Sequence, residues 1–283
     1  MATIKDFSGY EPTWCPGCGN WAIGIALKSA LVQLGLDPST VTIVFGIGCS
    51  GNMNDFINAY GFHSLHGRAI PCAVGIKIAN HRQKVIVVAG DGDCLGEGGN
   101  HLIHTARGNH DITVILHDNR VYGLTTGQAS PTSMKGYKSK STPFGIIEAP
   151  LNPLSLALTS GTTFVASAFA GNLAQMTQII KQGIDHRGFA LVNVLQPCVS
   201  FNKINNHQYY LQHSYNLDEK NTKNDFKKAV ELSLQVNEEK FPLGVIYQVQ
   251  QPTYTDQLPQ LKDKVLIDRK RFIDFKTLYS SFE

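Results

Sequence analysis

Short runs rich in valine and isoleucine recur along the chain and constrain its fold more than any other feature. Each run is short and mostly apolar rather than alternating, which is typical of a strand buried on both faces of a sheet. The runs are residues 41–46, 85–90, 112–117 and 190–195, with a weaker one at 163–166. Stretches of helical periodicity lie between them, at residues 21–34, 72–81, 98–108 and 172–187. Strands that alternate with helices predict an α/β fold with a doubly wound, mostly parallel sheet.

The pattern changes after residue 198. The remaining segment is polar and charged, with one short apolar run, FPLGVIY, and one amphipathic helix expected near residues 223–236. We therefore predict an α/β domain at residues 1–198 and a C-terminal extension at residues 199–283 that packs on the core or on a partner subunit.

Composition excludes several classes of protein. With 283 residues, of which 42% are hydrophobic, the chain is long enough to bury a full core. The formal net charge of +3 is small, so we expect neither nucleic acid nor a membrane as a partner. Residues 1–10 lack the pattern of a secretory signal, which predicts a cytoplasmic protein. Six cysteines are few for a disulfide scaffold, and a reducing compartment would keep them as thiols.

Glycine-rich or polar loops follow four of the predicted strands. They are GIGCSGN (46–52), GDGDCLGEGG (90–99), HDNRVYGLTTG (117–127) and QPC (196–198). Open parallel sheets bind ligands beyond the carboxyl ends of their strands. We therefore expect the four loops to converge on one site.

Two of these loops carry oxygen ligands that suit a divalent cation. Mg²⁺ prefers a few protein oxygens and completes its octahedron with phosphate oxygens and water. The Asp91 carboxylate, the Asn119 amide oxygen and the Val121 carbonyl would serve, leaving positions open for a diphosphate. The alternative is that Asp91 and Asn119 are ordinary turn residues. A nucleotide is disfavoured because the chain contains neither a G-x-G-x-x-G motif before a helix with an acidic ribose contact nor a P-loop.

The stretch TWCPGCGN, residues 13–20, places two cysteines around a Pro-Gly turn. This spacing is shared by thioredoxin-like redox centres, zinc sites and iron–sulfur sites, so it does not identify the chemistry by itself. A thioredoxin-like role predicts a strand before the motif. The motif stands near the start of the sequence with no predicted strand ahead of it.

Six motifs in order resemble one enzyme family. GDGD followed by Asn119 resembles the thiamine-diphosphate motif. Together WCPGCG, GIGCSGN, HGRAIP, GDGD, DNRVYGLTTGQASPTS and QPC resemble the β subunit of 2-oxoacid:ferredoxin oxidoreductases, from about residue 10 to residue 253. The resemblance implies a thiamine-diphosphate-binding fold of the diphosphate-binding type, with Mg²⁺ and one 4Fe-4S cluster bound by residues 1–198.

The resemblance also implies an activity and partners. The reaction is the coenzyme A-dependent oxidative decarboxylation of a 2-oxoacid, pyruvate or 2-oxoglutarate, to acyl-CoA and CO₂. Electrons pass through the cluster to ferredoxin. The chain would be active only with an α subunit that carries the pyrimidine-side domain. For this reason Glu97 is not assigned to activation of the aminopyrimidine, since the family's glutamate comes from that partner.

Site residues carry over from the resemblance by position. The implied Mg²⁺ ligands are Asp91, Asn119 and the Val121 carbonyl. The implied thiamine diphosphate contacts are Ile47, Gly48, Cys49, Ser50, His66, Gly92, Asp93, Gly123 and Leu124. The implied cluster ligands are Cys15, Cys18, Cys49 and Cys198.

Four further residues need a separate interpretation. His66, in HGRAIP, is the catalytic candidate through a polar contact with cofactor or substrate, although an isolated histidine is more often a simple hydrogen-bonding residue. Arg68 would bind a carboxylate or diphosphate, or brace its loop. Cys72 and Cys94 remain outside the cluster set and are expected to pack as small apolar residues.

Substrate and chemistry leave alternatives open. Asn52 and Thr126 are neutral at two positions beside the site, where some relatives with dicarboxylate substrates carry a basic side chain. This favours pyruvate or a broad range of small 2-oxoacids, unless the α subunit supplies the charge. One alternative is a thiamine-dependent decarboxylase or synthase without electron transfer, in which the cysteines hold zinc or nothing. Another is a non-catalytic iron–sulfur electron carrier.

Overall fold

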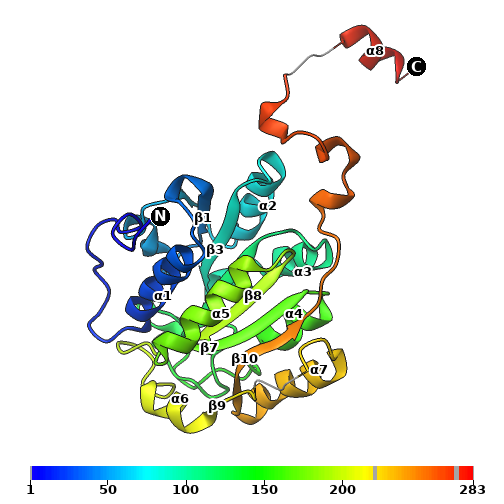
Figure 1. Ribbon diagram of the computed structural model, residues 1–283. Helices are drawn as coiled ribbons and strands as arrows, with labels where there is room; N and C mark the ends of the chain where they lie inside the picture. The colour runs from blue at the N-terminus through cyan, green and yellow to red at the C-terminus, as the bar shows by residue number, and fades with distance from the viewer. Residues whose placement is uncertain (1, 219–221, 271–273, 283) are drawn as a thin grey trace.

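The computed structural model describes residues 2–218, 222–270 and 274–282. Within these residues eight strands form one sheet in the order β2-β1-β3-β4-β8-β7-β10-β9 (Figure 1). Neighbouring strands run parallel, except that β10 runs antiparallel to β7. The strands are β1 (Val41–Phe45), β2 (Tyr60–His63), β3 (Lys84–Gly90), β4 (Thr113–Asp118), β7 (Phe164–Phe169), β8 (Ala190–Leu195), β9 (Ser214–Asn216) and β10 (Phe241–Gln248). The predicted mostly parallel α/β sheet is confirmed.

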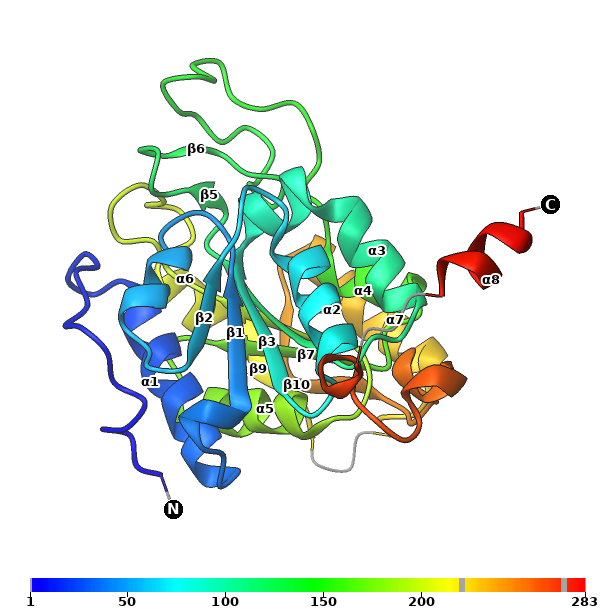
Figure 2. The same ribbon diagram turned by 90° about the horizontal axis from the view of Figure 1, so that it is seen from above.

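Helices cover both faces of this sheet, as Figure 2 shows. One face packs against α1 (Gly19–Gln33) and α5 (Leu173–Asp185). The other face packs against α2 (Ala69–Ala79), α3 (Gly99–Arg107), α4 (Pro153–Thr159) and α7 (Phe226–Leu234). Two apolar cores result, one on each side, and six strands have buried residues in both: β1, β3, β4, β7, β8 and β10. For the first five, this arrangement explains why their sequences are mostly apolar and do not alternate.

Side-chain caps define where several helices begin. Asn152 accepts a hydrogen bond from the Ser155 backbone N–H at 3.1 Å, and Asn172 accepts one from the Gln175 N–H at 3.3 Å. Asp225 caps α7 in the same way. Each such cap stabilises its helix by about 1 kcal/mol. The amphipathic helix expected at 223–236 is therefore α7, shortened to the residues that follow this cap.

The segment after residue 198 contributes to the sheet as well as lying on it. Residues 199–206 form a loop, followed by α6 (His207–His213) and β9. β10 then pairs with β7, and a register irregularity occurs between Val245 and Tyr247. The weak apolar run at 163–166 overlaps the start of β7, a fully buried strand that begins at Phe164 and extends to Phe169. The division into residues 1–198 and 199–283 stays a prediction.

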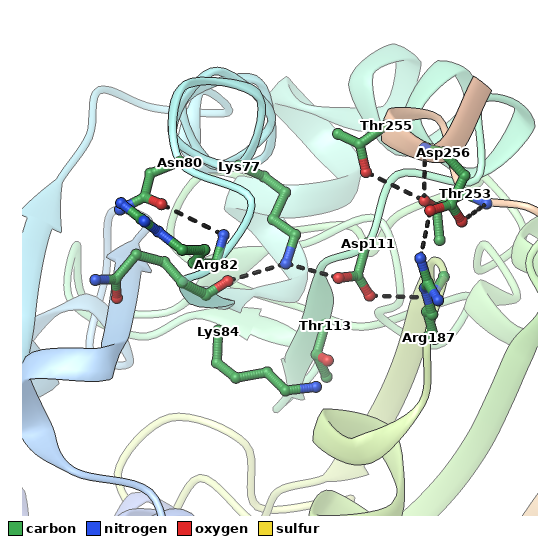
Figure 3. A network of polar contacts seen from close by, with 12 residues as sticks. Lys77, Asn80, Arg82, Lys84, Asp111, Thr113, Arg187, Thr253, Thr255 and Asp256 are labelled. Atoms are coloured by element: carbon green, nitrogen blue, oxygen red, sulfur yellow. Dashed lines mark hydrogen bonds and ion pairs between the residues drawn. The ribbon is translucent and has the colours of Figure 1, made fainter. Parts of the chain in front are cut away.

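The amino ends of the strands are tied together by charged side chains (Figure 3). Lys77 on α2 forms an ion pair with Asp111, at 2.6 Å, and donates a hydrogen bond to the Gln83 carbonyl at 2.9 Å. Arg187 pairs with Asp256, which joins the C-terminal segment to the loop before β8. These contacts lie at the opposite edge of the sheet from the polar loops described next.

The last part of the chain leaves the domain. Short 3₁₀ turns at residues 255–257, 259–261 and 266–268 lead to α8 (Phe275–Ser280), which stands away from the sheet in Figures 1 and 2. The described apolar side chains of α8 are exposed. Among the described residues, no helix combines the length and the apolar character needed to cross a membrane.

Candidate active site

The four polar loops converge at the carboxyl edge of the sheet, as expected for parallel strands. A cavity of about 430 Å³ lies between them. A small hairpin, β5 (Val121–Tyr122) and β6 (Gln128–Ala129), forms part of its wall and is visible in Figure 2. The wall contains every residue that the sequence analysis proposed for thiamine diphosphate or Mg²⁺: Ile47, Gly48, Cys49, Ser50, His66, Asp91, Gly92, Asp93, Asn119, Val121, Gly123 and Leu124.

Asp91 lies at the floor of this cavity and is only 1% exposed. One carboxylate oxygen, Oδ2, accepts hydrogen bonds of 2.5 Å from the Ser130 and Thr132 hydroxyls. Burial, and next the charge of nearby Asp118, raise the pKa of Asp91 to about 7. A bound cation would offset both effects, because it favours the ionised carboxylate. Asp91 is thus held in one orientation at a position where a positive charge would stabilise it.

A second buried acid, Asp118, lies close to Asp91. The Thr132 hydroxyl lies 2.8 Å from the Asp118 carboxylate as well as against Asp91. The positive charge of buried Arg120 lies near Asp118, and the Arg120 guanidinium stacks 5.2 Å from the centre of the Phe241 ring. Phe241 is on β10, so the C-terminal segment helps to enclose these charges.

The turn after β4 positions the amide of Asn119. Its Oδ1 accepts a hydrogen bond of 3.0 Å from the Val121 N–H, and its backbone carbonyl accepts one of 3.1 Å from Asn202. Arg120, between them, adopts a φ of +60°, the left-handed region that non-glycine residues seldom occupy. This turn directs the Asn119 side chain and the Val121 backbone to the same cavity.

Asp93 joins two loops of the cavity wall. Its Oδ1 accepts a hydrogen bond of 2.8 Å from the Gly67 N–H. The neighbouring loop approaches so closely that a Cβ at Gly46 would lie 2.1 Å from the Asp93 carboxylate. Gly46 is therefore required for packing, and Asp93 fixes the spacing between the HGRAIP and GIGCS loops.

Two side chains on the wall present polar atoms to the interior or rim. The Ser50 hydroxyl is buried and has no hydrogen-bond partner among the described residues, so it is free to donate a hydrogen bond to an oxygen of a bound ligand. His66 is exposed at the rim. Arg68, whose role was open, donates hydrogen bonds of 3.3 Å to the Gly67 and Glu97 carbonyls, which is a loop brace.

Tyr122, His117 and Gln196 are among the wall residues that were not proposed from the sequence. Tyr122 donates a hydrogen bond of 3.1 Å to the Gly92 carbonyl, and burial raises the pKa of its phenol. The Nδ1 of His117 lies 3.1 Å from Gln196 Oε1, and burial lowers the pKa of this histidine to about 4. Gln196 could have been noticed, because it precedes Cys198 in the QPC loop.

A second, smaller cavity of about 200 Å³ adjoins the first. Its wall includes all four cysteines proposed as cluster ligands: Cys15, Cys18, Cys49 and Cys198. They come from three separate chain segments. Five residues line both cavities: Cys49, Asn119, Gly123, Leu124 and Gln196. The two proposed cofactor sites therefore share a wall.

The CPGC turn is fixed to its surroundings by two indoles. Trp14 Nε1 donates a hydrogen bond of 2.7 Å to the Cys49 carbonyl, and Trp21 Nε1 donates one of 3.2 Å to the Cys15 carbonyl. Gly17 has a φ of +81°, which a side chain would strain, and allows the turn. The turn is thus held in place by contacts that do not involve its sulfurs.

The sulfurs influence one another electrostatically. Burial, and next the neighbouring cysteines, raise the pKa of the Cys49 thiol to about 11. Iron binds the thiolate, so binding would release these protons. Within the described residues, no three His, Cys, Asp or Glu side chains converge as ligands of a single metal ion. A 4Fe-4S cluster takes four thiolates around four irons, which fits four cysteines spread over a cavity wall.

The two remaining cysteines lie away from this cavity. Cys94 is 2% exposed and belongs to the apolar core on the α2 side of the sheet, and half-buried Cys72 on α2 packs against the same core. The expectation that both pack as small apolar residues is confirmed. Glu97 lies on the wall of the larger cavity, beside the Tyr122 hydroxyl.

Comparison with known proteins agrees with this geometry. Residues 46–194 match the family described as "Thiamine pyrophosphate enzyme, C-terminal TPP binding domain". Residues 198–263 match the family that describes the C-terminal part of the pyruvate ferredoxin oxidoreductase beta chain. The fold and site thus define a thiamine-diphosphate-enzyme domain joined to a C-terminal segment found in ferredoxin-linked oxidoreductases.

Sequence identity to individual proteins defines the family more narrowly. The chain is 46% identical over 248 residues to 2-oxoacid:ferredoxin oxidoreductase subunit beta of Saccharolobus solfataricus, covering 83% of this chain and 81% of that one. It is 47% identical over 199 residues to the 2-oxoglutarate oxidoreductase subunit KorB of Mycobacterium tuberculosis, covering 70% and 53%.

A solved structure extends the likeness to the whole fold. A 2-oxoglutarate:ferredoxin oxidoreductase from Magnetococcus marinus, with 2-oxoglutarate, coenzyme A and succinyl-CoA bound, matches with a TM-score of 0.92 and 36% identity, covering 100% of this chain and 96% of that one. The chain belongs to the β subunits of 2-oxoacid:ferredoxin oxidoreductases. It is an oxidoreductase subunit that requires a partner subunit for activity.

Proposed function

We propose that the larger cavity binds thiamine diphosphate through Mg²⁺ held by Asp91, Asn119 and the Val121 carbonyl. The buried Asp91 carboxylate is the observation that carries this proposal, because its position beside a second acid favours a cation. The unpartnered Ser50 hydroxyl and the close-packed Gly92 offer contacts for a diphosphate. A Cβ at Gly92 would lie 2.3 Å from the Tyr122 ring, so the residue cannot be larger without moving the wall.

The smaller cavity would bind one 4Fe-4S cluster through Cys15, Cys18, Cys49 and Cys198. Support comes from the common wall that these residues form and from the raised pKa of Cys49, to which three neighbouring cysteines contribute after burial, the larger cause. Because Cys49 also lines the larger cavity, an electron donor and acceptor would lie on either side of one loop. This arrangement favours electron transfer over simple decarboxylation, the first alternative considered above.

The reaction is the oxidative decarboxylation of a 2-oxoacid, with coenzyme A as acyl acceptor and ferredoxin as electron acceptor. When bound, thiamine diphosphate supplies the stabilised carbanion that loss of CO₂ requires. The residues of this chain bind the diphosphate end, orient it through Asp93 and the glycine loops, and offer His66 at the rim as a polar contact to substrate. The four cysteines would hold the cluster, which when bound would supply a path for electrons leaving the larger cavity.

The α subunit would complete the site and set its substrate range. Among the described residues, the wall of the larger cavity contains no lysine or arginine, although it holds the acids Asp91, Asp93 and Glu97. A second substrate carboxylate would require a charge-assisted hydrogen bond, so the choice between pyruvate and 2-oxoglutarate falls to cations of the α subunit. We place the assembled enzyme in the cytoplasm.

Reconstitution tests the function directly. The chain, its α subunit and their mixture would each be supplied anaerobically with thiamine diphosphate, Mg²⁺, coenzyme A and either pyruvate or 2-oxoglutarate. We expect reduction of ferredoxin or a viologen by the mixture alone. Full activity of this chain without its partner would contradict the proposal, as would decarboxylation by the mixture without reduction of the acceptor.

A further inference from the structure

One side chain connects the two cavities through hydrogen bonds. Gln196 follows β8, is 1% exposed, and lines both the larger and the smaller cavity. Its Nε2 lies 3.7 Å from Cys18 Sγ, within the range of a hydrogen bond to sulfur. Its Oε1 lies 3.1 Å from His117 Nδ1. The amide thus faces a proposed cluster ligand with one end and a histidine of the thiamine diphosphate cavity with the other.

The surroundings of His117 determine which way the Gln196 amide points. His117 Nδ1 faces two oxygens, Asn20 Oδ1 at 2.8 Å and Gln196 Oε1 at 3.1 Å. With both amide oxygens in these positions, Nδ1 carries the proton and donates to them, and the Gln196 Nε2 is left on the side of Cys18. All three side chains are at most 1% exposed, which leaves little room to rearrange. The Gln196 NH₂ group is therefore directed at Cys18.

A hydrogen bond to a ligating sulfur changes the energy of a cluster. Reduction adds one electron and thus one negative charge, part of which resides on the sulfurs. A donor directed at a sulfur stabilises that charge and raises the reduction potential. Because the donor is buried and Cys18 is half-buried, the effect is larger than at a fully exposed sulfur.

We propose that Gln196 is a positioning residue that donates a hydrogen bond to Cys18 and raises the reduction potential of the cluster, and that His117 fixes its orientation. The inference rests on the proposed binding of a 4Fe-4S cluster by the four cysteines. It assigns roles to two residues that lie in the quoted polar loops but were not proposed there as site residues. Through them, the wall of the thiamine diphosphate cavity is coupled to the electron acceptor.

The first test is a redox titration of the αβ enzyme followed by electron paramagnetic resonance. Gln196→Met keeps the side-chain length but removes the donor, so the potential of the cluster should shift to a more negative value with iron content unchanged. Gln128→Met is the matched control, because Gln128 lines the larger cavity but not the smaller one, and its potential should stay at the wild-type value. An unshifted potential in a fully loaded Gln196→Met enzyme overturns the inference.

A double-variant comparison tests the role of His117. His117→Leu should shift the potential in the same direction as Gln196→Met, because it leaves the amide without its orienting partner. If His117 acts through Gln196, the double variant should shift no further than Gln196→Met alone. Fully additive shifts would overturn the positioning role.

A spectroscopic measurement on the wild-type enzyme tests the hydrogen bond even if the variants lose their cluster. Glutamine labelled with ¹⁵N only in its side-chain amide should produce a hyperfine coupling to the reduced cluster, since Gln196 is the one glutamine among the described residues on the wall of the smaller cavity. Absence of this coupling overturns the inference. A wild-type enzyme that contains no iron and sulfide overturns both the proposed function and the inference, whereas a loaded enzyme without the coupling overturns the inference alone.

Discussion

Trp14 donates a hydrogen bond of 2.7 Å from its indole nitrogen to the backbone carbonyl of Cys49. The two residues are 35 positions apart in sequence, so this contact fixes the CPGC turn against the GIGCS loop. Trp14 is 8% exposed and packs edge-to-face on Phe56, with ring centres 4.9 Å apart. The relative position of the cysteines therefore depends on a tryptophan that is not itself a ligand.

Replacing Trp14 with phenylalanine should loosen this contact. Trp14→Phe keeps an aromatic ring but leaves the Cys49 carbonyl without its donor, so we expect a loss of about 2 kcal/mol in the free energy of unfolding. Iron should also be lost faster to a chelator. Trp21→Phe is the control, because Trp21 is only half-buried and bonds the carbonyl of exposed Cys15. Equal rates of iron loss in the two variants would contradict the prediction.

The hydroxyl of Thr132 should govern metal-dependent binding of thiamine diphosphate. Thr132→Val keeps the shape of the side chain but removes the hydrogen bond that orients Asp91. Loss of such a supporting contact weakens metal affinity by about 10-fold or more. Calorimetry with Mg²⁺ and thiamine diphosphate measures the change, and Thr132→Ser should restore affinity because it keeps the hydroxyl. Wild-type affinity in Thr132→Val would show that Asp91 needs no such support.

The ion pair between Lys77 and Asp111, at the opposite edge of the sheet from the cavities, should affect the free energy of unfolding but not cofactor binding. Asp111→Ala leaves the buried Lys77 ammonium without its counter-charge, which we expect to cost about 3 kcal/mol in the free energy of unfolding. Glu238→Ala is the control, because Glu238 and Lys240 form an exposed pair 3.9 Å apart. That variant should change stability by less than about 1 kcal/mol. Urea unfolding measures both, and a similar loss in each would contradict the assigned role of burial.

Acid should destabilise the protein partly through His186. Burial lowers the pKa of His186 from its ordinary value of 6.5, and the ring is 5% exposed with Nε2 2.9 Å from the Thr163 hydroxyl. Below pH 6.5 the unfolded chain binds a proton that the folded chain resists. Stability from this group is thus present above pH 6.5 and is lost as the pH falls towards the folded-state pKa.

Urea unfolding between pH 8 and pH 5 measures this contribution. His186→Gln removes the titrating group and can still hydrogen-bond to Thr163, so stability of the variant should fall less steeply than that of the wild type over the same range. Parallel pH profiles for the two proteins would show that His186 does not contribute.

The strands of the sheet were predictable from the sequence where both of their faces are buried. Strands such as β1 and β8 are enclosed on both faces, so every position is buried, most positions are apolar, and the run is recognisable. β10 was not recognised as a strand of this sheet because Pro242 and Gly244 interrupt it and its partner β7 is remote in sequence. Pairing of that kind depends on tertiary contacts rather than on local propensity.

The candidate site divides in a similar way. Residues that follow a strand directly, such as Asp91 and Asn119, were identified because parallel strands bring their ends together. Thr132 and Gln196 were missed, since their significance comes from side chains across the cavity. Asp118 beside Asn119 offered one signal, because a second acid at a strand end requires buried partners such as Thr132.

The central claim is that this chain holds both cofactors on the two sides of the Cys49 loop. Its most direct test is analysis of the αβ enzyme, purified anaerobically, for iron, acid-labile sulfide, zinc, magnesium and thiamine diphosphate. We predict about four iron and four sulfide per β chain, with one thiamine diphosphate and one Mg²⁺, and loss of iron but not of thiamine diphosphate in Cys18→Ser. A colourless enzyme with zinc and no sulfide, or a Cys18→Ser enzyme with full iron content, would contradict the account.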